Sequence, residues 1–172
     1  MNRHVMREQA FKLLFECEFH EIPEMEHQCA VYFDTLGEPK DLAELRLEMY
    51  RKDKLRHTKA LVQELNELEK QEMELIEKAR PDQEMVIAKV EAILSLIPEL
   101  DAVLNEKTEG WDTERLGKVE LTILRLALYE IKYEEDLDVA VSINEAVELA
   151  KTYGPEDSPA FINAVLSKIV NA

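Results

Sequence analysis

The chain has 172 residues, of which 46% are hydrophobic and 34% are charged. This length suits one domain with a substantial core, and the composition excludes a disordered chain. Only four glycines and six prolines occur, so helix breakers are rare and an all-α fold is expected. No apolar run approaches the roughly 20 residues of a membrane span, and the first residues lack the apolar segment of a secretory signal. We therefore expect a cytoplasmic protein without membrane association, whose two cysteines stay reduced.

The formal net charge is −16, and it is spread unevenly along the chain. The start carries Arg3, Arg7 and Lys12 against the single acid Glu8, whereas the remainder is strongly acidic. Proteins that bind nucleic acid normally present a basic footprint. Only the first helix offers one here, and the chain as a whole repels phosphate.

The first predicted helix spans residues 3–19 and has one apolar face. Arg3, Arg7 and Phe11 recur beside that face at i, i+4 and i+8, so they share a stripe of the helix. A proline then breaks the pattern, and a second, short helix is expected over residues 29–36.

Residues 41–82 are dense in Glu, Lys and Leu, with no glycine and no proline before Pro81. Such a composition favours long helices whose exposed faces carry many i,i+4 ion pairs. Two interpretations remain open at this point: a coiled-coil arm that binds another chain, or a helical hairpin that folds on its own domain, which we favour. We interpret residues 37–83 as a charged helical insertion in a single domain that spans residues 1–172.

Apolar residues become frequent again from Met85, and that helix is expected to kink at Pro98 and continue. The next helix holds the stretch Val119–Ile131, which is apolar on nearly all sides. A helix of that kind lies at the centre of a fold, because every face must be buried.

The last two predicted helices flank a turn within residues 141–166. Gly154 stands where a left-handed residue would end the first of them, and a proline follows it. Asp157 or Ser158 then offers an N-cap oxygen to the second helix, and Pro159 fits its first turn. The sequence predicts two packed helices joined by a capped turn.

No catalytic motif is present, whether a Gly-rich phosphate loop, a nucleophile elbow or a paired-cysteine motif. Glu24 and His27 have the spacing used by di-iron bundles, but the second such motif that those sites need is missing. We therefore expect no metal site, no cofactor and no enzymatic activity. The acidic run at residues 134–138 is interpreted as solvated loop charge, with a weak cation site as the alternative.

Four stretches carry a resemblance to a known family. ILRLALYEIKY, VAVSINEAVELAKTYG and EDSPAFINAVLSKI resemble the bacterial transcription antitermination factor NusB family in order, spacing and residue type. MREQAFKLLFECE resembles the first helix of that family. The resemblance covers residues 3–19 and about 88–170, and it implies two small helical bundles packed crosswise, without catalytic activity. The stretch 37–83 matches no part of the family pattern.

The resemblance also implies partners. Members of the family bind the boxA element of nascent single-stranded RNA together with the small-subunit ribosomal protein NusE. That complex joins other Nus factors on RNA polymerase during ribosomal RNA synthesis. Carried over residue by residue, the RNA-binding positions fall on the basic start and on the last turn: Arg3, His4, Arg7, Asp157, Ser158 and Phe161. The basic start is thin here, because Asn2, Val5 and Met6 stand where further basic residues are common.

Phe161 has two readings from its position alone. It lies about 90° from the centre of its helix's apolar stripe, so it either packs at the edge of the core or stacks on an unpaired base. We expect the turn before it to lie close enough to the first helix for the two to form one RNA-facing surface.

Two other functions compete with antitermination. A helical adaptor that has lost direct RNA binding would fit the net charge of −16 and the sparse arginines. The same fold also occurs as the N-terminal domain of ribosomal RNA cytosine methyltransferases. That reading requires a methyl-donor domain, and the sequence holds no segment of that kind.

Overall fold

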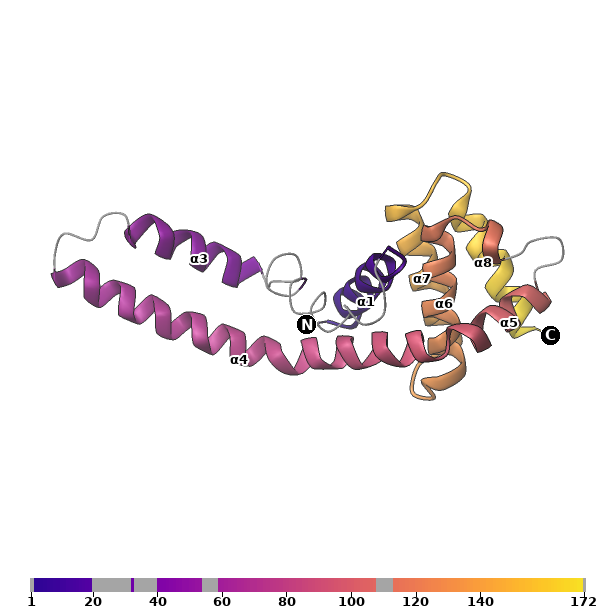
Figure 1. The fold of residues 1–172 in the computed structure, drawn as a ribbon, viewed down its shortest axis with the longest axis horizontal. Helices are drawn as coiled ribbons and strands as arrows, with labels where there is room; N and C mark the ends of the chain where they lie inside the picture. Colours follow the sequence, from indigo (N-terminus) through magenta and orange to yellow (C-terminus); the bar gives the residue numbers. More distant parts are fainter. Residues whose placement is uncertain (1, 20–31, 33–39, 54–58, 108–112, 172) are drawn as a thin grey trace.

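The computed structural model describes residues 2–19, 32, 40–53, 59–107 and 113–171, and these form helices without any strand (Figure 1). This confirms the expected all-α fold. None of the helices in this described part is long and apolar enough to cross a membrane. The elements in chain order are α1 (Arg3–Cys17), α3 (Lys40–Asp53), α4 (Lys59–Ser95), α5 (Ile97–Lys107), the 3-10 turn η2 (Thr113–Arg115), α6 (Lys118–Tyr133), α7 (Val139–Tyr153) and α8 (Ser158–Val170).

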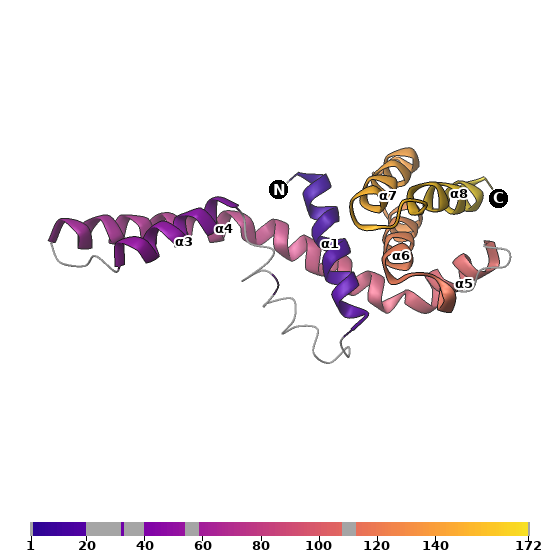
Figure 2. The same ribbon diagram turned by 90° about the horizontal axis from the view of Figure 1, so that it is seen from above.

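Helix α6 is the centre of the compact part of the molecule, as its all-round apolar sequence predicts. Helices α1, α5, α7 and α8 all pack against it, and Leu124 and Leu128 have no solvent exposure. In Figure 1, α6 stands upright beside α7 and α8, while the end of α4 and α5 run across it. Seen from above, α1 crosses α4 (Figure 2). The crosswise arrangement of two helical groups is therefore present, and we call this part the body.

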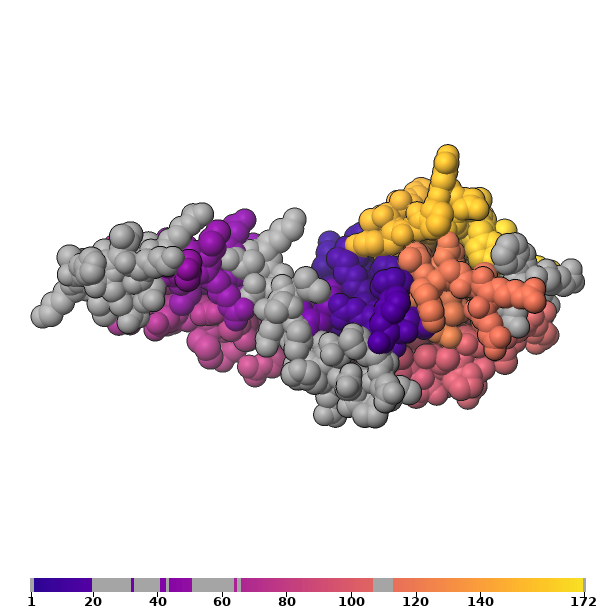
Figure 3. Space-filling model, turned by 45° about the horizontal axis from the view of Figure 1, so that its top comes forward, coloured from indigo at the N-terminus to yellow at the C-terminus, as the bar shows by residue number. Residues whose placement is uncertain are grey.

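Within the stretch 41–82, helix α3 packs against the first half of α4, so the described residues form a pair of helices. This pair, which we call the arm, extends away from the body (Figures 1 and 3). The expected boundary near residue 83 lies inside α4, which continues from the arm into the core, where Val86, Val90 and Ile93 are buried. Whether the arm is an independent insertion stays a prediction. The short helix expected over 29–36 falls outside the described residues, apart from Tyr32, which is buried.

Two prolines lie within helices of the described chain. Pro81 lies within α4 without ending it, because its side is exposed and water can bond the carbonyl that lacks an N–H partner. The kink expected at Pro98 is wrong, since α4 ends at Ser95 and α5 begins at Ile97. Pro98 therefore lies in the first turn of α5, where a missing N–H costs nothing.

Candidate nucleic-acid interface

The start of α1 is fixed by an N-cap. The side chain of Asn2 accepts a hydrogen bond from the backbone N–H of Val5 at 2.8 Å, which satisfies one of the free donors of the first turn. Of the basic residues that follow, Arg3 is exposed to solvent. His4 is also exposed, and its Nδ1 lies 2.7 Å from a carboxylate oxygen of Glu145 on α7.

Arg7 is buried, unlike Arg3 and His4. Its Nε donates to both carboxylate oxygens of Glu130 at 2.9 Å, and another guanidinium nitrogen lies 3.1 Å from Glu145. Glu130 has no solvent exposure and also receives a bond from Lys89 at 3.0 Å. Arg7 thus joins α1 to α6 and α7 inside the body. In this arrangement the positive charge of Arg7 is paired with Glu130 and Glu145. Its role as an RNA contact stays a prediction.

The turn between α7 and α8 differs in its packing from what the sequence predicts. Gly154 has φ −94° and ψ 167°, an extended conformation, so the expected left-handed residue is wrong. A Cβ at Gly154 would lie 2.8 Å from the carbonyl oxygen of Ala150 and 2.8 Å from the Cβ of Ser158. Glycine is therefore required by close approach and not by backbone conformation.

The expected N-cap oxygen is also absent from α8. Asp157 occupies the N-cap position but makes no side-chain cap bond, and the hydroxyl of Ser158 instead donates to the carboxylate of Glu120 on α6. Ser158 is consequently buried, while Asp157 is exposed. Pro159 does lie in the first turn of α8, as expected.

Phe161 is partly buried against the core, with the rest of its surface exposed. This is compatible with either reading of its position, because a ring at the core edge keeps one part accessible. Together with the exposed carboxylate of Asp157, it makes the first turn of α8 a surface with an aromatic and a polar group.

The end of α7 brings this turn next to the middle of α1. The ring of Tyr153 lies 5.0 Å from the ring of Phe11, and its hydroxyl donates to Glu8. Lys12 lies 2.8 Å from Glu8 and 5.8 Å above the Tyr153 ring. In Figure 3 the start of the chain adjoins the C-terminal helices on one face of the body. The basic group beside the turn is thus Lys12, which the i,i+4 spacing from Glu8 could have indicated.

Glu8, Lys12 and Tyr153 shift one another's pKa values. The pKa of Glu8 is lowered, chiefly by hydrogen bonds from Lys12 and Tyr153. Burial acts to lower the pKa of Lys12, but its bonds to Glu8 and Tyr153 outweigh burial and raise it. Lys12 therefore remains a cation at physiological pH, partly neutralised by Glu8.

Among the described residues, no group of three or more His, Cys, Asp or Glu side chains is arranged to hold a metal ion. Glu24 and His27, the pair with di-iron spacing, lie outside the described residues. Arg3 and His4 at the start of α1 and Asp157 just before α8 are exposed to solvent, while Lys12 and Phe161 are partly exposed.

The described residues define an all-α protein with a basic helix start and an aromatic residue near a turn, both at least partly accessible to solvent. The sequence pattern of the NusB family matches residues 43–171. The transcription antitermination protein NusB of Agathobacter rectalis is 39% identical over 168 residues, which cover 98% of each chain. The corresponding protein of Lachnoclostridium phytofermentans is 33% identical over 172 residues, or 99% of this chain and all of its own. The chain belongs to the NusB family.

Solved structures give the same picture of the fold. The structure of T. maritima NusB superposes with a TM-score of 0.63 at 28% identity and covers 99% of this chain and 92% of its own. A structure of the antitermination factors NusB and NusE in complex with dsRNA superposes with a TM-score of 0.56 at 21% identity, which shows the shared fold. The family match and the full-length relatives run through residues 43–83, so the arm is shared with relatives and is not peculiar to this chain.

Proposed function

We propose that the chain is a transcription antitermination factor that binds boxA-like single-stranded RNA together with a NusE-like ribosomal protein. It acts without catalysis in the cytoplasm, in a complex with other Nus factors on RNA polymerase. The observation that carries the proposal is membership of the family through relatives at 33–39% identity over nearly the whole chain. Those relatives carry the antitermination name, which favours this reading over a methyltransferase domain.

The RNA-facing surface in this proposal consists of the start of α1 and the first turn of α8. Arg3 and Lys12 supply charge for phosphate, and Phe161 supplies a ring on which an unpaired base stacks. Asp157 offers a carboxylate to base amino groups, while Ser158 and Arg7 support the surface from inside. Arg7 is a positioning residue in this scheme, because it fixes α1 against α6 and α7 through Glu130 and Glu145.

A gel shift with and without the NusE-like partner tests the proposal. The acidity of the chain predicts weak binding by the protein alone, micromolar or poorer at physiological salt. A basic partner adds positive surface beside the same RNA and should tighten binding strongly. Two or three phosphate contacts predict a shallow log–log salt slope of about −1.4 to −2.1. The partner-bound protein should prefer boxA-like RNA over a scrambled sequence.

Phe161→Ala separates stacking from charge. It should weaken RNA binding by about 1–3 kcal/mol and leave the salt slope unchanged. Arg3→Ala should instead flatten the slope by about 0.7. Tyr50→Ala and Arg80→Ala on the arm are the matched controls, because both residues are exposed there. The controls should bind as the unaltered chain does.

The adaptor reading predicts the opposite result. The adaptor interpretation is favoured by the burial of Arg7 and by the net charge of −16, because both reduce the positive charge that is available to RNA. If the partner-bound protein binds boxA-like and scrambled RNA equally, direct RNA recognition fails and the chain is an adaptor between proteins.

A further inference from the structure

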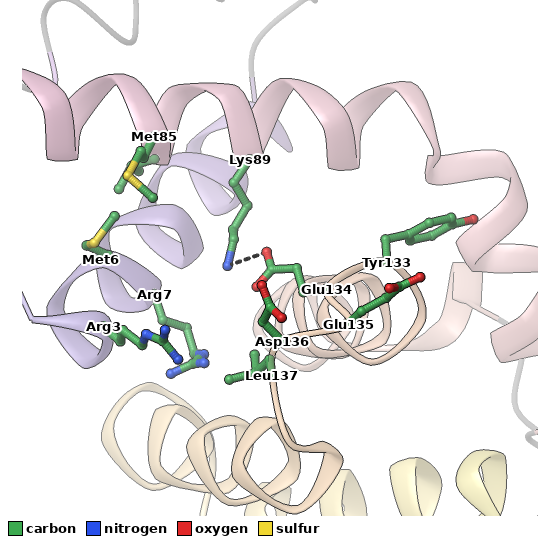
Figure 4. A pocket seen from close by; sticks show the side chains of 11 residues that line it. Arg3, Met6, Arg7, Met85, Lys89, Tyr133, Glu134, Glu135, Asp136 and Leu137 are labelled. Atoms are coloured by element: carbon green, nitrogen blue, oxygen red, sulfur yellow. Dashed lines mark ion pairs between the residues drawn. The ribbon is translucent and has the colours of Figure 1, made fainter.

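A hollow of about 560 Å³ lies between the start of α1, the middle of α4 and the connection from α6 to α7 (Figure 4). It is separate from the turn before α8, whose residues do not line it. The acidic run at residues 134–138 contributes part of its wall. That run therefore borders a hollow of ligand size, while Glu135 and Asp136 remain exposed to solvent.

The apolar part of the hollow comes from methionines and aliphatic residues. Met6, Met85, Val86 and Leu137 line it, and Figure 4 shows Met6 and Met85 side by side at one end. Val86 belongs to the core, whereas Met85 is 62% exposed. Methionine side chains adapt their shape to what they contact. An incoming apolar side chain would cover Met85 and reach the core through this opening.

The hollow has more unpaired negative charge than unpaired positive charge, because two of its basic residues already form ion pairs inside the protein. Lys89 lies 2.8 Å from Glu134 and 3.0 Å from Glu130, and Arg7 is held by Glu130 and Glu145. Within the described chain, Glu135 and Asp136 form no ion pair and are exposed. Two carboxylates therefore remain for a ligand, against the one exposed cation of Arg3.

We propose that this hollow docks a segment of a partner protein that presents a large apolar side chain flanked by lysine or arginine. The methionines receive the apolar side chain, and Glu135 and Asp136 receive the cations. Charge complementarity selects this partner, since the two free carboxylates attract a basic peptide and repel an RNA backbone. The volume of about 560 Å³ lies within the range of roughly 300–1,000 Å³ that is typical of ligand pockets. The hollow adjoins the proposed RNA surface at Arg3, but the docking is assigned to Met6, Met85, Glu135 and Asp136, which have no part in the proposed RNA binding.

Methionine methyl signals test the docking directly. The full chain labelled with [methyl-13C]methionine is titrated with the tripeptide amides acetyl-Arg-Leu-Lys and acetyl-Glu-Leu-Glu. We expect acetyl-Arg-Leu-Lys to shift the signals of Met6 and Met85 in a saturable way, and acetyl-Glu-Leu-Glu to leave them unchanged. Met73, exposed on the arm, is the internal control and should not move. Met6→Leu and Met85→Leu assign the signals.

A charge variant with a matched control completes the test. The double variant Glu135→Gln with Asp136→Asn should lower the affinity for the basic peptide by about two- to fivefold for each carboxylate removed. This fold-change corresponds to the free energy of an exposed ion pair. Glu69→Gln with Glu74→Gln removes the same charge from the arm, about 16–24 Å along α4 from Met85. This second pair should leave the affinity unchanged.

Three results would overturn the proposal. One is the absence of a saturable shift at about 10 mM basic peptide, a concentration at which even very weak ligands bind in part. Another is an equal response to the acidic peptide. The third is a shift of Met6 and Met85 caused by boxA-like RNA and not by peptide, which would make the hollow an RNA subsite. The effect of Phe161→Ala on RNA binding is measured without the peptides, so the proposed function can fail while peptide docking holds, and the reverse.

Discussion

The body and the arm are built from the same kind of amphipathic helix, but they bury side chains to very different degrees. In the body, helices surround α6 and leave residues such as Leu124 and Ile162 without exposure. In the arm, two helices share one seam, and the described part of it exposes Leu47 and Met73 by more than half. A helix pair can cover only one face of each partner, whereas a central helix is covered on all sides. Stability is therefore expected to reside in the body.

The ion pairs of the body and of the arm also differ in how deeply they are buried. The body buries Glu130 completely and gives it two cations, Arg7 and Lys89. The arm pairs Arg46 with Glu72 at 2.6 Å, but both side chains keep substantial contact with water. Removing one member of a buried pair leaves a charge that water cannot reach, while an exposed pair is replaced by solvent.

The largest effect is expected from Glu130→Gln. It should lower the free energy of unfolding by about 3–5 kcal/mol, because Arg7 and Lys89 lose the carboxylate that compensates their charge. Urea unfolding followed by circular dichroism measures this. Glu72→Gln in the arm is the control and should cost about 0.2–1 kcal/mol. Equal costs at the two positions would remove the distinction between body and arm.

Truncation of a core leucine should come next. Leu124→Ala or Leu128→Ala is expected to cost about 2–5 kcal/mol, since each leaves a cavity in the fully buried centre. The exposed Leu47→Ala in the arm should stay within about 0.5 kcal/mol of the unaltered chain. A loss below about 1 kcal/mol at both core positions would contradict the central place of α6.

The pH dependence of stability should be a smaller effect that originates in the body. Glu8 has a lowered pKa through hydrogen bonds from Lys12 and Tyr153. At Glu145, burial acts to raise the pKa, but the bond from His4 and the charge of Arg7 outweigh it and lower the pKa. Both carboxylates therefore stabilise the fold above their ordinary pKa of 4.5, and this contribution is lost as the pH falls below that value.

The variant Glu8→Gln with Glu145→Gln checks this sign. Its free energy of unfolding should change less than that of the unaltered chain between about pH 5 and pH 3. Glu69→Gln with Glu74→Gln on the arm controls for net charge. A pH profile of the first variant as steep as that of the unaltered chain would show that other groups dominate acid unfolding.

The sequence predicted the features that depend on local pattern. The all-round apolar stretch of α6 indicated a central helix, and the Glu- and Lys-rich stretch indicated the helix pair of the arm, because both follow from helical periodicity. The burial of Arg7 could not be predicted, because its partner Glu130 lies 123 residues away along the chain and nothing local signals a buried long-range pair. Gly154 was identified as a helix end for the wrong reason, since its close contact with Ser158 exists only in the folded turn.

The location of the candidate RNA site rests on the family resemblance and stays a prediction. The family resemblance indicated the residues, and the structure adds that Arg3 and Asp157 are exposed while Arg7 and Ser158 are buried. The hollow beside α1 could not be inferred from sequence, because it is formed by three segments that are distant along the chain.

The most direct test of the division between body and arm is RNA binding by a chain without the arm. Residues 37–83 are replaced by a short Gly/Ser linker, and α4 then begins just before Val86, its first residue in the main core. The shortened chain should melt cooperatively and, with the NusE-like partner, keep the preference of the full chain for boxA-like over scrambled RNA. A shortened chain that folds but loses this preference would contradict the account, because the arm would then belong to the functional surface.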